Sequence, residues 1–300
     1  MNEPIVTATS AACRGTTFLE RIGSAVNSRL AGVPLHNWGK RVFHWLLQLR
    51  TAGGGLVCRL PDGESVRIAP AYRYLTWNLQ EYRAFKQALR PGAVALDIGA
   101  NVGCYSLLFG QWVGPAGRVF AFEPSPESFA GLCRHIALNR LAGAVTPVQA
   151  AVSDASADVQ LLSDGFQGTN RLLFPGEPAG ARCTFSAPAV TVDEFCEREQ
   201  ILPDLIKIDV EGFELAVLRG ARRTIRACGD RLSLFVEMHP KTWAAVGMTM
   251  EDLLTELEIQ GLAAAPLQEG GPLWSVEGIC LRLTKKGTRL VSGPRFLRSS

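Results

Sequence analysis

From about residue 94 onward, the chain alternates between short apolar runs and longer segments in which apolar residues recur every three or four positions. Short apolar runs are typical of buried strands, and the longer spacing is typical of amphipathic helices. The pattern predicts strands at 94–97, 118–122, 145–149, 205–209, 232–237, 262–265 and 278–283. It predicts intervening helices at 103–113, 126–139, 193–199, 213–227 and 249–260. Strands that alternate with helices over short connections form a parallel sheet with right-handed crossovers. We therefore predict an α/β fold with a doubly wound, mostly parallel, seven-stranded Rossmann-like sheet.

Two regions depart from this alternation. The N-terminal region combines helical spacing with a β-hairpin, and residues 155–192 contain short alternating pieces with many turn residues. The elements expected before the sheet are helices at 16–30, 38–49 and 78–89 and strands at 56–60 and 65–68. We expect residues 155–192 to be a β-rich insertion near the substrate side. The predicted organisation is an N-terminal extension over 1–72, a main domain over 73–285 and a basic flexible tail over 286–300.

The first strand of the sheet ends in an acid that is followed by a glycine-punctuated turn, D-I-G-A-N-V-G. In doubly wound proteins a strand, a tight turn and a helix N-terminus form a ligand pocket. The glycines do not follow the G-x-G-x-x-G spacing, and the acid would repel a pyrophosphate but attract an amino group or a sulfonium cation. The predicted cofactor-binding residues here are Asp97, Gly99, Ala100, Asn101 and Gly103. A helix-capping or structural role is the alternative for Asp97.

The ends of the next two strands supply further cofactor candidates. Glu123 closes the second strand about 20 residues after the turn, where an acid accepts hydrogen bonds from ribose hydroxyls. We assign Pro124 and Ser125, which follow it, to the same site. Ser153 and Asp154 follow the third strand, where a short polar side chain can receive the adenine amine. An ordinary turn opened by the Ser-Asp pair is the alternative there.

A second group of polar residues lies at the ends of two later strands. Asp209 and Glu211 are two positions apart, as are Glu237 and His239, so each pair points to one side if its strand continues that far. Neighbouring parallel strands would bring the four side chains to one rim beside the cofactor. The crowded carboxylates should then raise the pKa of the histidine and of one acid. The alternative is that Glu211 caps a helix and His239 lines a loop. We expect Lys207, on the same strand, to form a structural ion pair with a carboxylate.

Four motifs together resemble the FkbM-family methyltransferases. They are D-I-G-A-N-V-G, F-E-P-S-P, A-V-S-D and I-K-I-D-V-E-G-F-E-L-A-V-L-R-G-A, and the resemblance covers about residues 75–285. The last motif, with the downstream E-M-H, is the most family-specific. The resemblance implies an enzyme that uses S-adenosyl-L-methionine (SAM) to methylate a hydroxyl of a sugar or another small metabolite. The first seventy residues match no family pattern.

The resemblance leaves the source of the catalytic base open. His239 is the first candidate because the unperturbed pKa of histidine is nearest neutrality, and Asp209 is the second. Alternatively, Asp209, Glu211 and Glu237 could hold Mg²⁺, which would acidify the hydroxyl. We favour the version without a metal site. Two other classes stay open, a nicotinamide-dependent oxidoreductase and a non-catalytic binding subunit with the same fold.

Composition and net charge indicate which classes of binding partner to expect. The 31 basic residues are scattered among 28 acidic ones, and the resulting net charge of +3 is too small to indicate binding to nucleic acid. The eight cysteines form no C-x-x-C pair, so we expect reduced, mostly buried thiols in a cytoplasmic protein. The sequence contains neither a recognisable signal peptide nor an apolar run long enough to span a membrane. The expected partner is a small hydroxyl acceptor. Neither the identity of the acceptor nor the oligomeric state can be predicted.

Overall fold

The computed structural model describes residues 10–12, 53–73, 75–163, 171–172, 183–267 and 278–287. The helices expected at 16–30 and 38–49, and all but the first two residues of the expected basic tail, lie outside these residues. Among the described helices, none is both long enough and apolar enough to cross a membrane.

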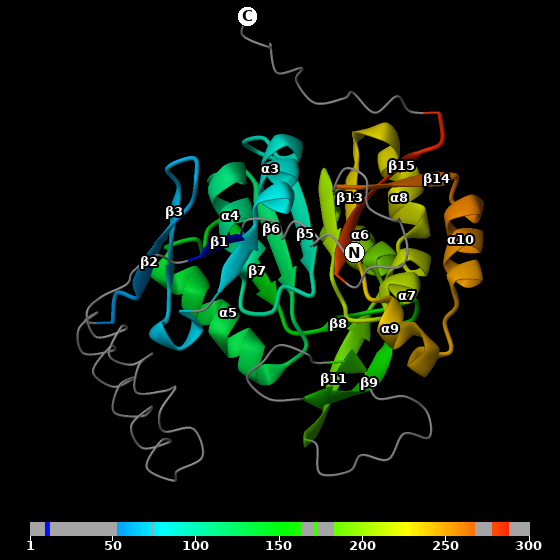
Figure 1. Ribbon diagram of the computed structural model, residues 1–300, viewed down its shortest axis with the longest axis horizontal. Helices are drawn as coiled ribbons and strands as arrows, with labels where there is room; N and C mark the ends of the chain where they lie inside the picture. The colour runs from blue at the N-terminus through cyan, green and yellow to red at the C-terminus, as the bar shows by residue number, and fades with distance from the viewer. Residues whose placement is uncertain are drawn as a thin grey trace, which may run out of the picture.

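A seven-stranded sheet forms the centre of the molecule (Figure 1). Its order is β14-β15-β13-β12-β5-β6-β7, and the antiparallel β15 is the exception in an otherwise parallel arrangement. The strands are β5 (Val94–Ile98), β6 (Arg118–Phe122), β7 (Val145–Val148), β12 (Leu205–Ile208), β13 (Ser233–Met238), β14 (Leu262–Pro266) and β15 (Ile279–Lys285). The predicted Rossmann-like fold class is therefore confirmed.

Helices cover both faces of this sheet because strand residues alternate between two apolar cores. One core joins the sheet to α3 (Leu79–Ala88), α4 (Cys104–Val113) and α5 (Pro126–Leu138). The other joins it to α6 (Val192–Glu199), α7 (Glu214–Arg219), α8 (Arg222–Cys228) and α10 (Met250–Ile259). The short helix α9 (Pro240–Trp243) follows β13. The described residues also include the 3₁₀ turns η1 (Pro70–Tyr72), η2 (Gly229–Arg231) and η3 (Ala244–Val246).

The helix predicted at 213–227 is wrong as a single element, because it is divided into α7 and α8. The break lies at Gly220, where a Cβ atom would come within 2.1 Å of the Ser153 carbonyl oxygen. The start of α8 is capped from another helix: the carboxylate of Asp193 accepts hydrogen bonds from the backbone N–H groups of Arg223 and Thr224. Both features come from residues distant in sequence, so helical periodicity alone did not reveal them.

The region from β8 to β11 is rich in strands, as predicted. A four-stranded sheet in the order β10-β9-β11-β8 is formed by β8 (Ala151–Val152), β9 (Ala157–Ser163), β10 (Arg171–Leu172) and β11 (Cys183–Val190). Figure 1 shows β8, β9 and β11 at one end of the main sheet. This end contains the loops that follow β5, β6 and β12, so the insertion forms one wall of the pocket described below.

The predicted hairpin is also present, as β2 (Leu56–Arg59) and β3 (Ser65–Ile68). A further antiparallel pair joins β1 (Ser10–Ala12) to β4 (Thr76–Asn78). The hairpin packs into the core that contains α3, α4 and α5. Beside it, the imidazole of His135 accepts a hydrogen bond from Ala69 N–H at Nε2 (2.9 Å) and contacts the Val102 carbonyl through Nδ1 (2.7 Å).

One expectation about the cysteines is wrong. Cys58, on β2, is disulfide-bonded, whereas we expected every cysteine to be a reduced thiol. The thiols of Cys104, Cys133, Cys196, Cys228 and Cys280 are free, so none of these is the partner. Spacing along the chain did not reveal the bond because Cys58 belongs to no short-range cysteine pair.

Candidate active site

The glycine-punctuated turn after β5 fits between the neighbouring strands β6 and β12. The N–H groups of Gly99 and Ala100 both donate to the Phe122 carbonyl, at 3.1 and 2.8 Å, and Gly103 N–H donates to the Ala100 carbonyl. Gly99 has φ +78°, and a Cβ atom there would lie 1.7 Å from the Asp209 carbonyl oxygen. Glycine is therefore required at this position both by the backbone conformation and by the close approach of β12.

Glu123 is held at the end of β6 by the same turn. Its Oε2 accepts a hydrogen bond from Asn101 N–H (2.8 Å), and its Oε1 accepts one from Ser125 N–H (2.9 Å). Burial raises the pKa of its carboxyl to about 7, although these two N–H groups act in the opposite direction. The turn after β5 and the loop after β6 thus both donate to one carboxylate, which fixes its orientation.

A pocket lies between this carboxylate and the loop after β12. It is lined by Ile98, Gly99, Asn101, Phe122, Glu123, Pro124, Ala150, Ala151, Val152, Leu161, Asp209, Val210, Glu211 and Phe213. Four predicted cofactor residues, Gly99, Asn101, Glu123 and Pro124, are in this lining. Ala100, Gly103 and Ser125 support it through backbone hydrogen bonds.

The other predicted cofactor residues do not line the pocket. Ser153 and Asp154 lie beyond it: Ser153 N–H bonds to the Val190 carbonyl, and the wall at this strand end is formed by residues 150–152. Asp97 is buried, and it accepts a hydrogen bond from Ser106 Oγ at 2.5 Å. Its Oδ1 lies 3.8 Å from Lys207 Nζ, which in turn donates to Asp209 Oδ2 at 3.0 Å. Lys207 thus has the carboxylate partners that were expected of it.

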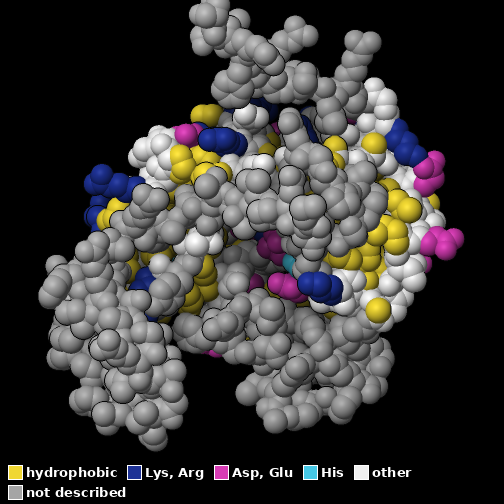
Figure 2. Space-filling view, in the orientation of Figure 1, with side chains coloured by type: hydrophobic (Ala, Val, Ile, Leu, Met, Phe, Trp, Pro, Cys, Tyr) yellow, Lys and Arg dark blue, Asp and Glu magenta, His cyan; other side chains and the backbone are white. Residues whose placement is uncertain are grey.

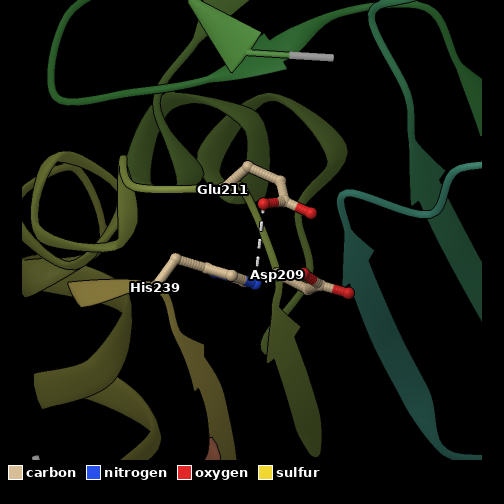
Figure 3. Close-up of side chains that lie close together, drawn as sticks. All are labelled: Asp209, Glu211 and His239. Carbon is tan, nitrogen blue, oxygen red and sulfur yellow. Dashed lines mark ion pairs between the residues drawn. The ribbon is translucent and has the colours of Figure 1, made fainter. Parts of the chain in front are cut away.

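The structure brings the four predicted rim residues together. Figure 2 shows acidic side chains gathered around a histidine in the middle of one face, and Figure 3 shows Asp209, Glu211 and His239 pointing toward one another. His239 Nε2 lies 3.8 Å from each of three carboxylate oxygens: Asp209 Oδ1, Glu211 Oε2 and Glu237 Oε1. Asp209 and Glu211 also line the pocket, so this cluster opens directly onto the candidate cofactor site.

Sequence reasoning missed the group that holds the other side of the imidazole. Glu214, the first residue of α7, is completely buried, and its Oε1 lies 2.7 Å from His239 Nδ1. Glu214 is visible in the sequence as the second acid of E-G-F-E. Because it lies inside the helix predicted at 213–227, the sequence did not indicate that its side chain contacts the residue after β13.

The electrostatics of the cluster follow from its crowding. Burial by itself would lower the pKa of His239, but the bond to Glu214 and the charges of Asp209 and Glu211 raise it to about 9. Burial and the nearby charge of Asp209 raise the pKa of the Glu237 carboxyl. One histidine and one acid are therefore shifted upward, as the predicted arrangement requires.

A second missed acid approaches from α3. Glu81 is buried, accepts a hydrogen bond from Tyr105 Oη at 2.6 Å, and has a pKa raised mainly by burial. The ring of Tyr105 lies 5.5 Å from Lys207 Nζ. No sequence signal connects Glu81 with β12, because α3 precedes the sheet and its approach depends on packing.

In the described part of the chain, the side chains that are grouped closely enough to hold a metal ion are those of the cluster around His239. One ligand atom from each of Asp209, Glu211 and His239 lies within 4.8 Å of the other two. Carboxylate and imidazole together suit a divalent transition metal, whereas an all-oxygen set would suit magnesium better.

The fold and the pocket together suit a nucleoside-type cofactor beside an acid–imidazole cluster. The chain belongs to the FkbM methyltransferase family, since the model of the "Methyltransferase FkbM domain" matches residues 97–262, more than half of its length. The family membership that the sequence motifs indicated is therefore confirmed.

Individual relatives match this chain over part of their length and at modest sequence identity. Hexuronic acid methyltransferase AglP of Haloferax volcanii is 25% identical over 173 residues, which cover 54% of this chain and 66% of the relative. The 31-O-demethyl-FK506 methyltransferase FkbM of Streptomyces tacrolimicus is 47% identical over 101 residues, or 32% of this chain and 38% of the relative. The chain thus matches less than two thirds of each of them. Among solved structures, methyltransferase FkbM from Methylobacillus flagellatus is similar with a TM-score of 0.42 and 19% identity, over 68% of this chain and 50% of that one.

Proposed function

We propose that this protein transfers the methyl group of SAM to a hydroxyl oxygen of a sugar or another small metabolite. The observation that carries the proposal is the position of Asp209 and Glu211, which belong both to the pocket lining with Glu123 and to the cluster around His239. A cofactor held at Glu123 would have its reactive end near these groups. Two relatives, a hexuronic acid methyltransferase and a 31-O-demethyl-FK506 methyltransferase, support a small-molecule acceptor.

The cofactor side of the site fits an adenosyl group. The Glu123 carboxylate is oriented by two backbone N–H groups, and its remaining acceptor capacity suits the two ribose hydroxyls. The absence of a side chain at Gly99 lets the turn approach the Asp209 backbone closely, and both residues line the pocket. SAM supplies a methyl group activated by its sulfonium charge, and the excess of carboxylates around Asp209 favours a cation there.

On the acceptor side, the chain must remove the hydroxyl proton. His239 is the preferred base because its Nε2 faces the rim of the pocket, whereas Asp209 is engaged by the ammonium of Lys207. With a pKa of about 9, His239 is charged at neutral pH in the free protein and becomes a base as it loses that proton. We therefore expect kcat/KM to rise with pH through an apparent pKa near 9.

The base assignment is tested by His239→Ala. We expect turnover to fall by at least about tenfold, because general base catalysis contributes roughly 10²–10⁴-fold. SAM affinity, measured by calorimetry, should remain near that of the wild type. Full turnover in this variant would remove His239 from the mechanism.

The metal alternative has a separate test. Asp209 and Glu211, with His239 or Glu237, offer ligands for a divalent cation that could acidify the hydroxyl. Without a metal requirement, turnover should be unchanged after treatment with EDTA. Loss of turnover that magnesium or manganese restores would favour the metal mechanism instead.

A further inference from the structure

Glu214 is the most completely enclosed charged side chain of the site. It lies between the loop after β12 and helix α9, with none of its surface exposed. Its Oε1 accepts a hydrogen bond from Gly212 N–H at 2.9 Å and contacts His239 Nδ1 at 2.7 Å. Its Oε2 accepts a hydrogen bond from the indole N–H of Trp243 at 3.1 Å. A carboxylate that is fully buried from solvent is tolerated only when its oxygens are hydrogen-bonded.

These contacts determine which ring nitrogen of His239 carries a proton. A backbone N–H and an indole N–H can only donate, so both oxygens of the Glu214 carboxylate act as acceptors. The short contact with Nδ1 is then a hydrogen bond that Nδ1–H donates. In neutral His239 the lone pair must therefore be on Nε2, the nitrogen that faces Asp209 and Glu211 (Figure 3). Glu237 Oε1 lies at the same distance from Nε2.

We propose that Glu214 is a positioning residue of the methyl-transfer reaction: it holds His239 in the tautomer whose Nε2 accepts the hydroxyl proton, and it stabilises the imidazolium that results. The inference rests on the proposed function. In that step the O–H bond breaks as the Nε2–H bond forms, the oxygen supplies the electron pair of the new O–C bond, and the C–S pair leaves with sulfur. The proton then passes from His239 to solvent.

The four carboxylates around His239 differ in their distance from the ring and therefore in the effect that we expect from each. Asp209 and Glu211 after β12, together with Glu237 on β13, lie 3.8 Å from Nε2, beyond hydrogen-bond distance. Of these four carboxylates, Glu214 alone lies within hydrogen-bond distance of the ring. We therefore expect Glu214 to control the tautomer and a large part of the raised pKa, whereas Asp209 and Glu211 act through charge at longer range.

The rival role for Glu214 is purely structural, as the acceptor that ties α9 to α7 through Trp243. Trp243→Phe is the matched control, because it removes the indole donor and leaves the contact between Glu214 and His239. Glu214→Gln is the test variant, because an amide keeps the shape but places a donor against groups that themselves donate. Both variants should be less stable than the wild type, so stability alone does not separate the two roles.

The decisive readout is ¹⁵N NMR of the imidazole rings in the full chain, with the His239 signal identified from its loss in His239→Gln. In the wild type above its pKa, we expect His239 to carry its proton on Nδ1. We expect Glu214→Gln to lower the pKa of His239 by roughly one unit or more, and to shift the rising limb of the kcat/KM profile by the same amount. Trp243→Phe should leave both near the wild-type values.

An Nε2–H tautomer in the wild-type protein would overturn the proposal, even if Glu214→Gln failed to fold. So would a His239 pKa that is unchanged in Glu214→Gln, or lowered equally in Trp243→Phe. Calorimetry with SAM on the same samples separates this inference from the proposed function. If the wild type binds no SAM, the proposed function fails, whereas the tautomer and the pKa still report on Glu214 independently.

Discussion

At the scale of single residues, Lys207 balances the charges beneath the site. Its ammonium is buried and lies between Asp97 and Asp209, and Asp97 Oδ1 has no hydrogen-bond partner in the described part of the chain. Removal of one member of a buried pair leaves an uncompensated charge, which costs far more than the loss of a surface pair. The lysine therefore stabilises both the strand end and the carboxylate that lines the pocket.

We predict that Lys207→Met lowers the free energy of unfolding by about 3–5 kcal/mol. The comparison is Lys286→Met, which removes an exposed pair with Glu258 and should change it by less than about 1 kcal/mol. Urea titration of both variants measures the difference. Equal stability of the two would mean that the Asp97 charge is compensated by another group.

At the scale of secondary-structure elements, the turn between β5 and α4 depends on the contact between two strands. Gly99→Ala combines a positive φ with a Cβ 1.7 Å from the Asp209 carbonyl oxygen. Gly92→Ala has a similar φ of +81° and nothing within 4 Å, so it isolates the conformational cost of about 1–2 kcal/mol.

We expect Gly99→Ala to lose more than about 4 kcal/mol of stability and to bind no SAM, since the strand ends must separate. Gly92→Ala should lose only the conformational cost and bind SAM normally. Thermal unfolding and calorimetry on the two variants make the comparison. Similar behaviour of both would show that close packing against β12 is unimportant.

The contact of the hairpin with α5 gives a prediction about pH. Burial lowers the pKa of His135 below its ordinary value of 6.5, although the contact with the Val102 carbonyl acts in the opposite direction. The hydrogen bond that Nε2 accepts from Ala69 N–H also requires that nitrogen to be unprotonated. The unfolded chain therefore takes up a proton, as pH falls through that value, before the folded chain does. Stability contributed by His135 is present above pH 6.5 and declines below it, by up to about 1.4 kcal/mol per pH unit.

The measurement is the difference in unfolding free energy between the wild type and His135→Gln. This difference should be largest near pH 8 and shrink steadily toward about pH 5. Because the other titrating groups are common to both proteins, their contributions cancel. A difference independent of pH would indicate that His135 is not held neutral by these contacts.

At the scale of the whole molecule, the mostly parallel seven-stranded sheet and the meeting of four strand-end residues could be predicted from the sequence. Both depend on local rules: the alternation of apolar runs with helical spacing, and the alternating direction of side chains in a strand. Asp209, Glu211, Glu237 and His239 needed only these rules and the expectation that neighbouring parallel strands end at the same edge.

The features that could not be predicted depend on packing between distant segments. Glu214 reaches His239 because α7 starts directly behind β13, and Glu81 reaches Tyr105 because α3 lies against α4. The break at Gly220 comes from the approach of the Ser153 carbonyl. None of these has a period or a spacing along the chain that sequence reasoning could detect.

The central claim is that Glu123 anchors SAM in the pocket beside the Asp209–His239 cluster, and calorimetry with SAM tests it most directly. The wild type and Glu127→Ala, an exposed control on α5, should bind SAM equally, with no comparable heat from NAD⁺. Glu123→Ala should bind about tenfold to a hundredfold more weakly, as expected for the loss of charge-assisted hydrogen bonds to the ribose. No heat with the wild type, or equal affinity in Glu123→Ala, would contradict the account.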